Sequence, residues 1–231
     1  MRDVNIRRAI HYAINKSEVV GEEPDYSITN NLIPLSLLGS NPEANPDLYN
    51  LEAARQALAL SGLHNSRRLK INLWHATNFQ ERKKLLARLA NNLQAVGLEV
   101  DLRIVPSLRE LLEKIYSGQT QLFLIGEVID FPDPDALLNR LFNSKSKGNP
   151  FAYKNVEVDR LLREAQTTLD EHLRAQLYGK IEKQILEDHV MIPLFLAKCS
   201  FVTHKNVQGI EVNPLGFQYL PFRKVWLQPL R

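Results

Sequence analysis

The sequence predicts an α/β fold built around a parallel β-sheet. Between residues 69 and 125, segments with strand-like alternation are separated by segments whose apolar residues recur at helical spacing. The third strand-like segment, residues 122–125, is a continuous apolar run, which is typical of a strand buried on both faces. This order implies parallel strands joined by helical crossovers. We therefore expect a parallel βαβαβ core with flanking helices.

The part of the chain before this core predicts two helices and a long loop. Residues 4–14 carry apolar side chains at helical spacing, and Asp3 is placed to cap that helix. Asn50 is placed to cap a second helix over residues 51–60. Residues 21–47, between the helices, are rich in proline, asparagine and glycine. Long irregular segments of this kind tend to be functional or to wrap a neighbour, so we expect this one to cover a cleft or to pack on a lobe outside this chain.

Within the core, each element has its own signal. Alternation over residues 69–73 and 98–104 predicts the first two strands. The helix between them carries a leucine stripe over residues 85–96. Ser107 and Glu110 form a capping-box pattern that opens the next helix.

After the core, the sequence becomes helical and then extended. Asp133 and Pro134 open a helix with its apolar face over residues 137–142. Two further helical stripes follow, over residues 158–165 and 173–185. Near Asp188 the helical spacing of apolar residues ends. The residues that follow have strand-like patterns interrupted by prolines and glycines. The change predicts a structural boundary there.

Composition excludes several classes of protein. The 231 residues are 44% hydrophobic and 24% charged, which are ordinary globular values. A formal charge of +3 is too small to indicate nucleic-acid binding, and no basic stretch is interleaved with aromatic residues. Cys199 is the only cysteine, which excludes an internal disulfide and a thiolate-rich metal site. The first residues lack the apolar stretch of a signal peptide, and no apolar run approaches the ~20 residues of a membrane helix.

The most concentrated polar feature is a run of carboxylates, Asp130, Asp133 and Asp135, interleaved with Phe131 and prolines. It follows the third predicted strand, and ligands of open parallel sheets bind beyond the carboxyl ends of the strands. These carboxylates could bind a cation or a ligand ammonium group. Aspartate and proline also favour turns, and Asp133 is placed to cap the next helix. Both interpretations of the segment remain open at this stage.

The histidines show no catalytic or metal-binding arrangement. No two of them have the i, i+4 spacing of a helical zinc site, and the sequence lacks a glycine-rich phosphate loop and a nucleophile elbow. His75 ends the first predicted strand, so it lies either in the cleft or in the core. We expect no cofactor, no metal and no enzymatic activity.

The order of several motifs resembles the dipeptide/oligopeptide family of extracellular solute-binding proteins, the receptors of ABC importers. Each motif is weak evidence alone, but the motifs occur in the same order as in the family and together span nearly the whole chain. The matching segments are residues 5–16 (NIRRAIHYAINK), 49–62 (a Tyr-Asn start and a Ser-Gly end), 93–100 (LQAVGLEV), 118–134 (the strand followed by Gly126, Asp130 and Asp133-Pro134), 153–159 (YKNVEVD) and 192–195 (IPLF).

The resemblance implies a class II periplasmic-binding-protein-like lobe of a two-lobed protein that closes on its ligand. It implies that residues 1–188 form the large C-terminal lobe and that residues 189–231 return toward an N-terminal lobe outside this chain. In peptide-binding members, the aspartate matching Asp130 pairs with the free α-amino group of the ligand. The residue matching Arg82 faces the ligand in some members.

The sequence departs from the family pattern close to Asp130, at the corner formed by residues 126–134. The tryptophan that follows the family's strand is replaced by Glu127, next to Val128. A second carboxylate near Asp130 makes the corner more acidic, so we expect an amine-bearing ligand to fit better than a neutral one. The expected ligand-binding residues are therefore Asp130, Glu127, Phe131, Val128, Arg82 and His75.

Two classes of function are compatible with this resemblance. The first is the solute-binding component of an ABC importer for peptides or other amine-bearing solutes, which works with a membrane permease in the periplasm or cell envelope. The alternative is a cytoplasmic ligand-sensing domain behind an N-terminal DNA-binding domain, with no nucleic-acid contact from this chain. A hydrolase that uses Asp130 and Asp133 is the least favoured interpretation, because no partner histidine or nucleophile is identifiable near them.

Overall fold

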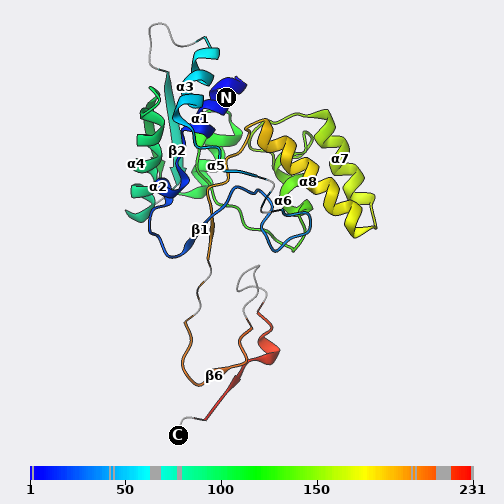
Figure 1. The fold of residues 1–231 in the computed structure, drawn as a ribbon. Helices are drawn as coiled ribbons and strands as arrows, with labels where there is room; N and C mark the ends of the chain where they lie inside the picture. The colour runs from blue at the N-terminus through cyan, green and yellow to red at the C-terminus, as the bar shows by residue number, and fades with distance from the viewer. Residues whose placement is uncertain are drawn as a thin grey trace.

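The computed structural model shows a body of two packed units and a C-terminal segment that extends away from it (Figure 1). One unit is built on the β-sheet and the other consists of helices. The structure describes residues 1, 3–41, 43, 45–62, 69–76, 80–198, 200, 202–211 and 220–229. Cys199 lies outside these described residues.

The sheet unit confirms the predicted parallel core. β2 (Lys70–Ala76) lies between β3 (Glu99–Val105) and β4 (Leu122–Phe123), and both neighbours run parallel to it. The helices α4 (Gln80–Gln94) and α5 (Leu108–Tyr116) connect the strands. The sheet therefore has the strand order β3-β2-β4.

The alternation of β2 assigns its two faces to different helices. Ile71 and Leu73 are buried and pack with the leucine stripe of α4. Trp74 belongs to a smaller cluster with residues of α5, which include Leu111 and Ile115. A strand with apolar residues on both faces requires a cover on each side, and α4 and α5 supply the two covers.

The third strand is shorter and less buried than the sequence predicts. Only Leu122–Phe123 pairs with β2, and residues 122–125 are all partly exposed. β4 lies at one edge of the three-stranded sheet, so it has a hydrogen-bonding neighbour on one side only among the described residues. Its alternate side chains pack on both faces, Leu122 and Leu124 against one core cluster and Phe123 and Ile125 against another, so the predicted cover on two sides is present while the burial is only partial.

The N-terminal helices pack on the α4 side of the sheet. α1 (Val4–Ala13) starts where the Asp3 side chain accepts a hydrogen bond from the Asn5 amide at 2.7 Å. The short α2 (Lys16–Val20) follows, and Asn50 caps α3 (Leu51–Leu60) through the Ala53 amide at 2.9 Å. Buried residues of α1, α2 and α3 join the β2–α4 cluster.

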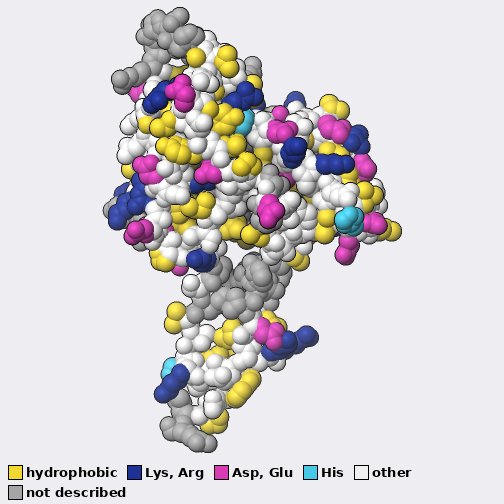
Figure 2. All heavy atoms as spheres, in the orientation of Figure 1, with side chains coloured by type: hydrophobic (Ala, Val, Ile, Leu, Met, Phe, Trp, Pro, Cys, Tyr) yellow, Lys and Arg dark blue, Asp and Glu magenta, His cyan; other side chains and the backbone are white. Residues whose placement is uncertain are grey.

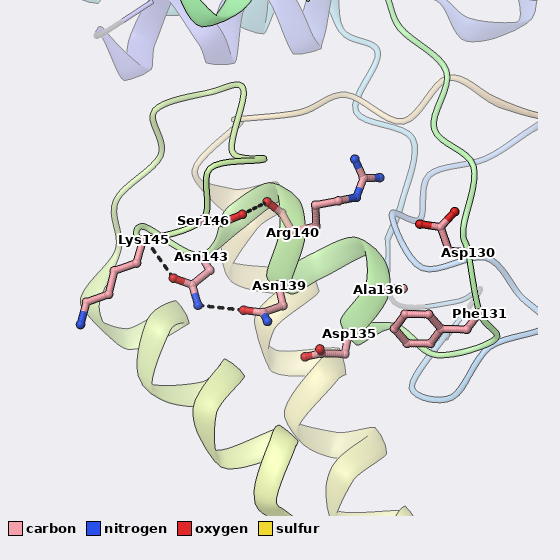
Figure 3. Close-up of a pocket in the computed structure, with 9 residues that line it drawn as sticks. All are labelled: Asp130, Phe131, Asp135, Ala136, Asn139, Arg140, Asn143, Lys145 and Ser146. Carbon is pink, nitrogen blue, oxygen red and sulfur yellow. Dashed lines mark hydrogen bonds between the residues drawn. The ribbon is translucent and has the colours of Figure 1, made fainter.

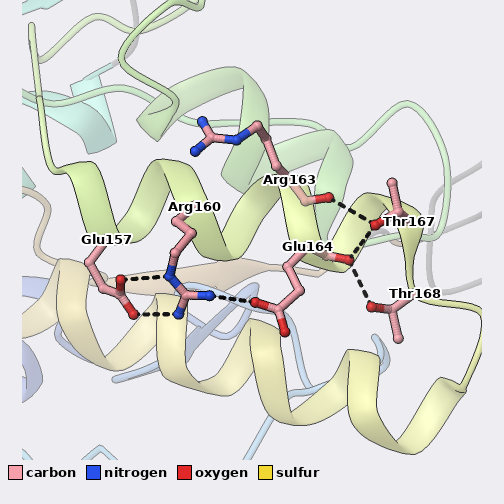
Figure 4. A network of polar contacts seen from close by, with 6 residues as sticks. All are labelled: Glu157, Arg160, Arg163, Glu164, Thr167 and Thr168. Carbon is pink, nitrogen blue, oxygen red and sulfur yellow. Dashed lines mark hydrogen bonds and ion pairs between the residues drawn. The ribbon is translucent and has the colours of Figure 1, made fainter.

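The second unit consists of α6 (Asp135–Phe142), α7 (Val156–Thr167) and α8 (Glu171–Glu187). Its core contains Phe142 and Leu162, both fully buried. The outer face of α7 carries surface ion pairs, in which Arg160 contacts Glu157 at 2.7 Å and Glu164 at 2.6 Å (Figure 4). These side chains are about half exposed, so the pairs contribute little to stability and leave packing as the main source.

The long loop packs on the helical unit. Leu32 and Ile33 are buried in its core, and the Ile33 amide donates to Oε1 of the buried Glu182 at 2.8 Å. The same loop contains the short strand β1 (Tyr26–Ile28), which pairs antiparallel with β5 (Phe195–Ala197). The sequence left the loop's packing partner open, and the structure assigns much of the contact to α8.

The C-terminal segment leaves the body after β5 (Figure 1). It contains the antiparallel pair β6 (Val207–Gln208) and β7 (Trp226–Leu227) and a short 3-10 turn over Phe222–Lys224. Figure 2 shows hydrophobic side chains on the surface of this segment. Val202 is 97% exposed. The proposed boundary between residues 1–188 and 189–231 stays a prediction.

Candidate functional site

The carboxylate segment follows the sheet as predicted and leads into α6. The Leu124 amide donates to the Trp74 carbonyl at 2.9 Å, which is the last backbone bond that holds this segment to the sheet among the contacts described. The chain then runs irregularly from Gly126 to Pro134 before α6 begins. The polar side chains of this segment are therefore held between the carboxyl end of β4 and the first turn of α6.

An open pocket lies between this segment and one face of α6 (Figure 3). Its volume is ≈ 460 Å³. The lining is polar apart from Phe131 and Ala136, and it contains both carboxylates and cations. The lining residues are Asp130, Phe131, Asp135, Ala136, Asn139, Arg140, Asn143, Lys145 and Ser146.

Asp130 and Phe131 form one wall of the pocket (Figure 3). Both side chains are accessible, and Phe131 is 50% exposed. The opposite wall comes from α6, where Leu137 and Leu138 face the core and leave the other helix face to line the pocket. An exposed carboxylate beside an exposed aromatic ring is an arrangement that can receive a ligand ammonium group.

Glu127 does not add uncompensated charge to this corner. Its carboxylate forms an ion pair with the Arg140 guanidinium at 2.5 Å, and both side chains are partly shielded from solvent. The structure therefore modifies the expectation of a more acidic corner, because Arg140 offsets the charge that replaces the family's tryptophan. The pair also braces the carboxylate segment against α6.

Asp133 has a structural role in the helical unit. Its carboxylate binds the Arg174 guanidinium at 2.6 and 3.0 Å, and one oxygen accepts from the Asp135 amide at 2.9 Å. Pro134 occupies the N-cap position of α6, and the Asp133 side chain accepts from the first amide of the helix and joins it to α8. Tyr178 donates to the same carboxylate at 3.3 Å, and burial raises the pKa of the Tyr178 hydroxyl. These contacts support the turn-and-cap interpretation for Asp133 and leave Asp130 as the accessible carboxylate.

Four of the six predicted ligand-binding residues lie outside the pocket lining: Glu127, Val128, Arg82 and His75. The His75 ring Nδ1 is 2.7 Å from the Leu124 carbonyl, and the ring is buried, so burial lowers its pKa. Its Nε2 atom has no hydrogen-bond partner in the described structure. The Arg82 guanidinium lies 5.9 Å from the centroid of the Tyr26 ring. Val128 is 69% exposed and is also absent from the lining.

Sequence reasoning missed the α6 face of the pocket. Asp135, Asn139 and Asn143 recur at four-residue spacing on the side opposite the helix's apolar stripe. This polar row was a usable signal, because it begins immediately after the carboxylate segment. One oxygen of Asp135 is buried without a partner in the described structure, while the other accepts from Gln166 at 3.2 Å.

The arrangement suits reversible binding. Carboxylate, guanidinium and amide groups around one pocket can hold a polar solute through hydrogen bonds and charge. Among the described residues, no cluster of three His, Cys, Asp or Glu side chains is placed to hold a metal. In the same part of the chain, no helix is both long and apolar enough to cross a membrane.

Comparisons with known proteins agree with this picture. Residues 1–149 match the family described as bacterial extracellular solute-binding proteins, family 5. The dipeptide-binding protein of Escherichia coli is 27% identical over 93% of this chain and 41% of its own length. The oligopeptide-binding protein OppA of Bacillus subtilis is 26% identical over 98% of this chain and 43% of its own length. The chain thus spans less than half the length of these relatives.

Solved structures show the same fold. The periplasmic binding protein DppA of Helicobacter pylori, in complex with the peptide STSA, superposes with a TM-score of 0.83 at 22% identity, over 98% of this chain and 44% of its own. HbpA2 of Haemophilus parasuis also gives a TM-score of 0.83, at 24% identity, over 98% of this chain and 45% of its own. At this level of identity the two structures establish the fold alone.

Proposed function

Because the chain belongs to the bacterial extracellular solute-binding proteins of family 5, we propose that it supplies one lobe of a receptor that delivers peptides or other amine-bearing solutes to an ABC importer. The observation that carries the proposal is the solvent-exposed carboxylate of Asp130 at the wall of a polar pocket. The family consists of binding proteins, so the proposal includes no catalytic step.

The proposed ligand contact is between Asp130 and a free amino group. An ammonium group leaving water needs an anionic hydrogen-bond partner. Glu127 and Asp133 form ion pairs with Arg140 and Arg174, and both are less exposed to solvent than Asp130. Phe131 offers an apolar face beside the carboxylate. We include Val128 and Arg82 only as contacts to parts of the ligand that extend beyond this pocket, and we leave out His75 because its ring is buried.

The binding mechanism we propose is capture between two lobes. The chain spans 41% and 43% of the two peptide-binding relatives, so a second lobe of the same protein is the expected partner. The open pocket then forms half of the site, and hinge closure buries the ligand between the lobes. The closed protein would meet the permease at the membrane from the periplasmic or extracellular side, because the family is described as extracellular and the Helicobacter pylori protein as periplasmic.

The experiment is a titration of the whole gene product with a tripeptide that has a free amino terminus and with its N-acetylated form. Asp130→Asn should weaken binding of the free-amine peptide by roughly ten- to a hundredfold, because a charge-assisted hydrogen bond contributes about 1.5–3 kcal/mol. Asp25→Asn, which changes an exposed carboxylate away from the pocket lining, should leave affinity unchanged. Equal affinity of wild type and Asp130→Asn for the free-amine peptide would refute the assignment.

A further inference from the structure

The Arg140 guanidinium contacts its ion-pair partner through one nitrogen only. Its Nη2 atom donates to Oε2 of Glu127 at 2.5 Å. Among the described residues, the Nε and Nη1 atoms of Arg140 make no hydrogen bond. A guanidinium group carries five N–H donors in a rigid planar fork. Most donors of Arg140 are therefore left for a partner that lies outside the described part of the chain.

Arg174 provides the contrast within the same helical unit. Its Nη1 and Nη2 atoms donate to both carboxylate oxygens of Asp133. Nη2 also donates to the Tyr178 hydroxyl at 2.7 Å, and Nε donates to the Ala165 carbonyl at 3.1 Å. All three nitrogens of Arg174 thus have partners inside the protein, as expected of a structural arginine, whereas two nitrogens of Arg140 do not.

The ion pair presents its cation to the pocket and not its anion. Arg140 lines the pocket with Asp130, and Glu127 does not belong to the lining. The Arg140 side chain is 39% exposed, while that of Glu127 is 20% exposed. Figure 3 shows the Arg140 side chain extending from α6 on the side of the pocket where Asp130 lies. A ligand in this pocket therefore meets a carboxylate and a guanidinium on the same side.

The loop after α6 fixes the position of the Arg140 side chain. The Ser146 hydroxyl donates to the Arg140 carbonyl at 2.6 Å, which holds the loop against the end of the helix. A Cβ atom on Gly148 would lie only 2.8 Å from Cγ of Arg140, so the stem of the arginine packs closely on this glycine. Glu127 fixes the other end of the side chain. A side chain that is already held loses less conformational freedom when it binds a ligand.

A guanidinium group with available donors is suited to a carboxylate, because its fork matches two carboxylate oxygens. Under the proposed function, Asp130 receives the free amino group of a peptide. A carboxylate that reaches Arg140 must then lie close to the amino end of the same peptide. The side chain of an acidic amino-terminal residue meets this requirement, whereas the terminal carboxylate of a tripeptide lies at its far end.

We propose that Arg140 is a specificity-determining residue of the pocket, which selects peptides whose amino-terminal residue is acidic. The proposal rests on the proposed function, because Asp130 must hold the amino group for the neighbouring side chain to reach Arg140. Glu127 then orients the arginine and does not contact the ligand itself.

The test compares two tripeptides of almost equal size, Glu-Ala-Ala and Gln-Ala-Ala, each titrated into the whole gene product. We expect Glu-Ala-Ala to bind about five- to tenfold more tightly, which is the range for one partly exposed charge-assisted contact. Arg140→Gln should remove this preference while Gln-Ala-Ala still binds, and that binding shows that the variant is folded. Arg163→Gln changes an exposed arginine of α7 outside the pocket lining and should leave the preference unchanged.

Glu127→Gln separates a ligand contact from a bracing role. It breaks the same ion pair as Arg140→Gln but keeps the guanidinium, so the preference for Glu-Ala-Ala should rise. If Arg140 only braced the segment against α6, both variants would change the affinities for the two tripeptides by the same factor. That result would overturn the proposal.

Asp130→Asn distinguishes failure of this proposal from failure of the proposed function. It should weaken binding of both tripeptides, because both carry the free amino group. Equal affinities of the wild type for the two tripeptides, both weakened by Asp130→Asn, would overturn the specificity of Arg140 alone. A wild type that binds neither tripeptide, or affinities that Asp130→Asn leaves unchanged, would overturn the proposed function and this proposal with it.

Discussion

Acid should destabilise this protein through a pair of buried histidines. Nδ1 of His11 on α1 and Nδ1 of His189, just after α8, are 2.9 Å apart, and both side chains are at least nine-tenths buried. One ring must donate and the other must accept, so the accepting ring must be neutral and the contact is lost when both rings are protonated. Because α1 belongs to the sheet unit and α8 to the helical unit, this contact joins the two halves of the body.

Burial and neighbouring cations lower the pKa of both rings. The pKa of His11 falls to about 3, through burial and through the nearby His189 and Lys16. The pKa of His189 falls to about 4, through burial and through Arg8 and Arg7. Both values lie below the ordinary histidine pKa of 6.5. The unfolded chain therefore binds protons that the folded chain excludes, and stability must fall as the pH falls below 6.5.

The magnitude follows from linkage. At pH 5, protonation of one histidine stabilises the unfolded chain by about 2 kcal/mol. Protonation of both histidines therefore lowers the free energy of unfolding by about 4 kcal/mol relative to pH 7. The loss continues until the pH reaches the folded pKa values. The neighbouring Asp188 raises the pKa of His189, but this effect is smaller than the lowering by burial and by the arginines. For a domain of ordinary stability, this loss is a large fraction of the total.

The assay is urea unfolding at pH 7 and pH 5, with His189→Asn as the test variant. His189 has a positive φ of 49°, which asparagine tolerates better than most residues, so the backbone is preserved. We expect the loss of stability between the two pH values to shrink by about 2 kcal/mol or more. His172→Asn, at an exposed position, should leave the loss unchanged. Equal losses in wild type and His189→Asn would refute the reasoning.

Three further predictions concern the helical unit, each measured by chemical denaturation. Arg174→Ala leaves the Asp133 carboxylate without its guanidinium partner and should cost about 1–3 kcal/mol. Phe142→Ala removes a fully buried ring from the core and should cost about 3–5 kcal/mol. Gly39→Ala places a methyl group 2.8 Å from the α8 backbone at a φ of +79°, so it should destabilise by more than Gly118→Ala, which has a φ of +73° but open space around it.

Much of the fold could be predicted from the sequence because its signals are local. The leucine stripe of α4 and the alternation of β2 depend on residues a few positions apart, and the structure confirms the elements that they predict. The length and the burial of β4 were over-predicted because they, too, were judged from local sequence alone. Its apolar run was visible in the sequence, but the absence of a strand on its outer side among the described residues was not.

The candidate site was harder to predict because its contacts join residues far apart along the chain. The Asp133–Arg174 pair spans 41 positions, and only the packing of α6 on α8 brings the two side chains together. The Glu127–Arg140 pair is closer in sequence, but it depends on how the irregular segment folds back onto α6. The family resemblance had already favoured Asp130, but the hold of Arg174 on Asp133 and the exposure of Asp130 were visible only in the structure.

The most direct test of the central claim is a side-by-side calorimetric titration of this chain and of the whole gene product with a short peptide that has a free amino terminus. The account predicts saturable heat for the whole product and none for the chain alone, since one lobe offers only an open half-site. Binding of equal, micromolar affinity by the chain alone would contradict the two-lobed mechanism.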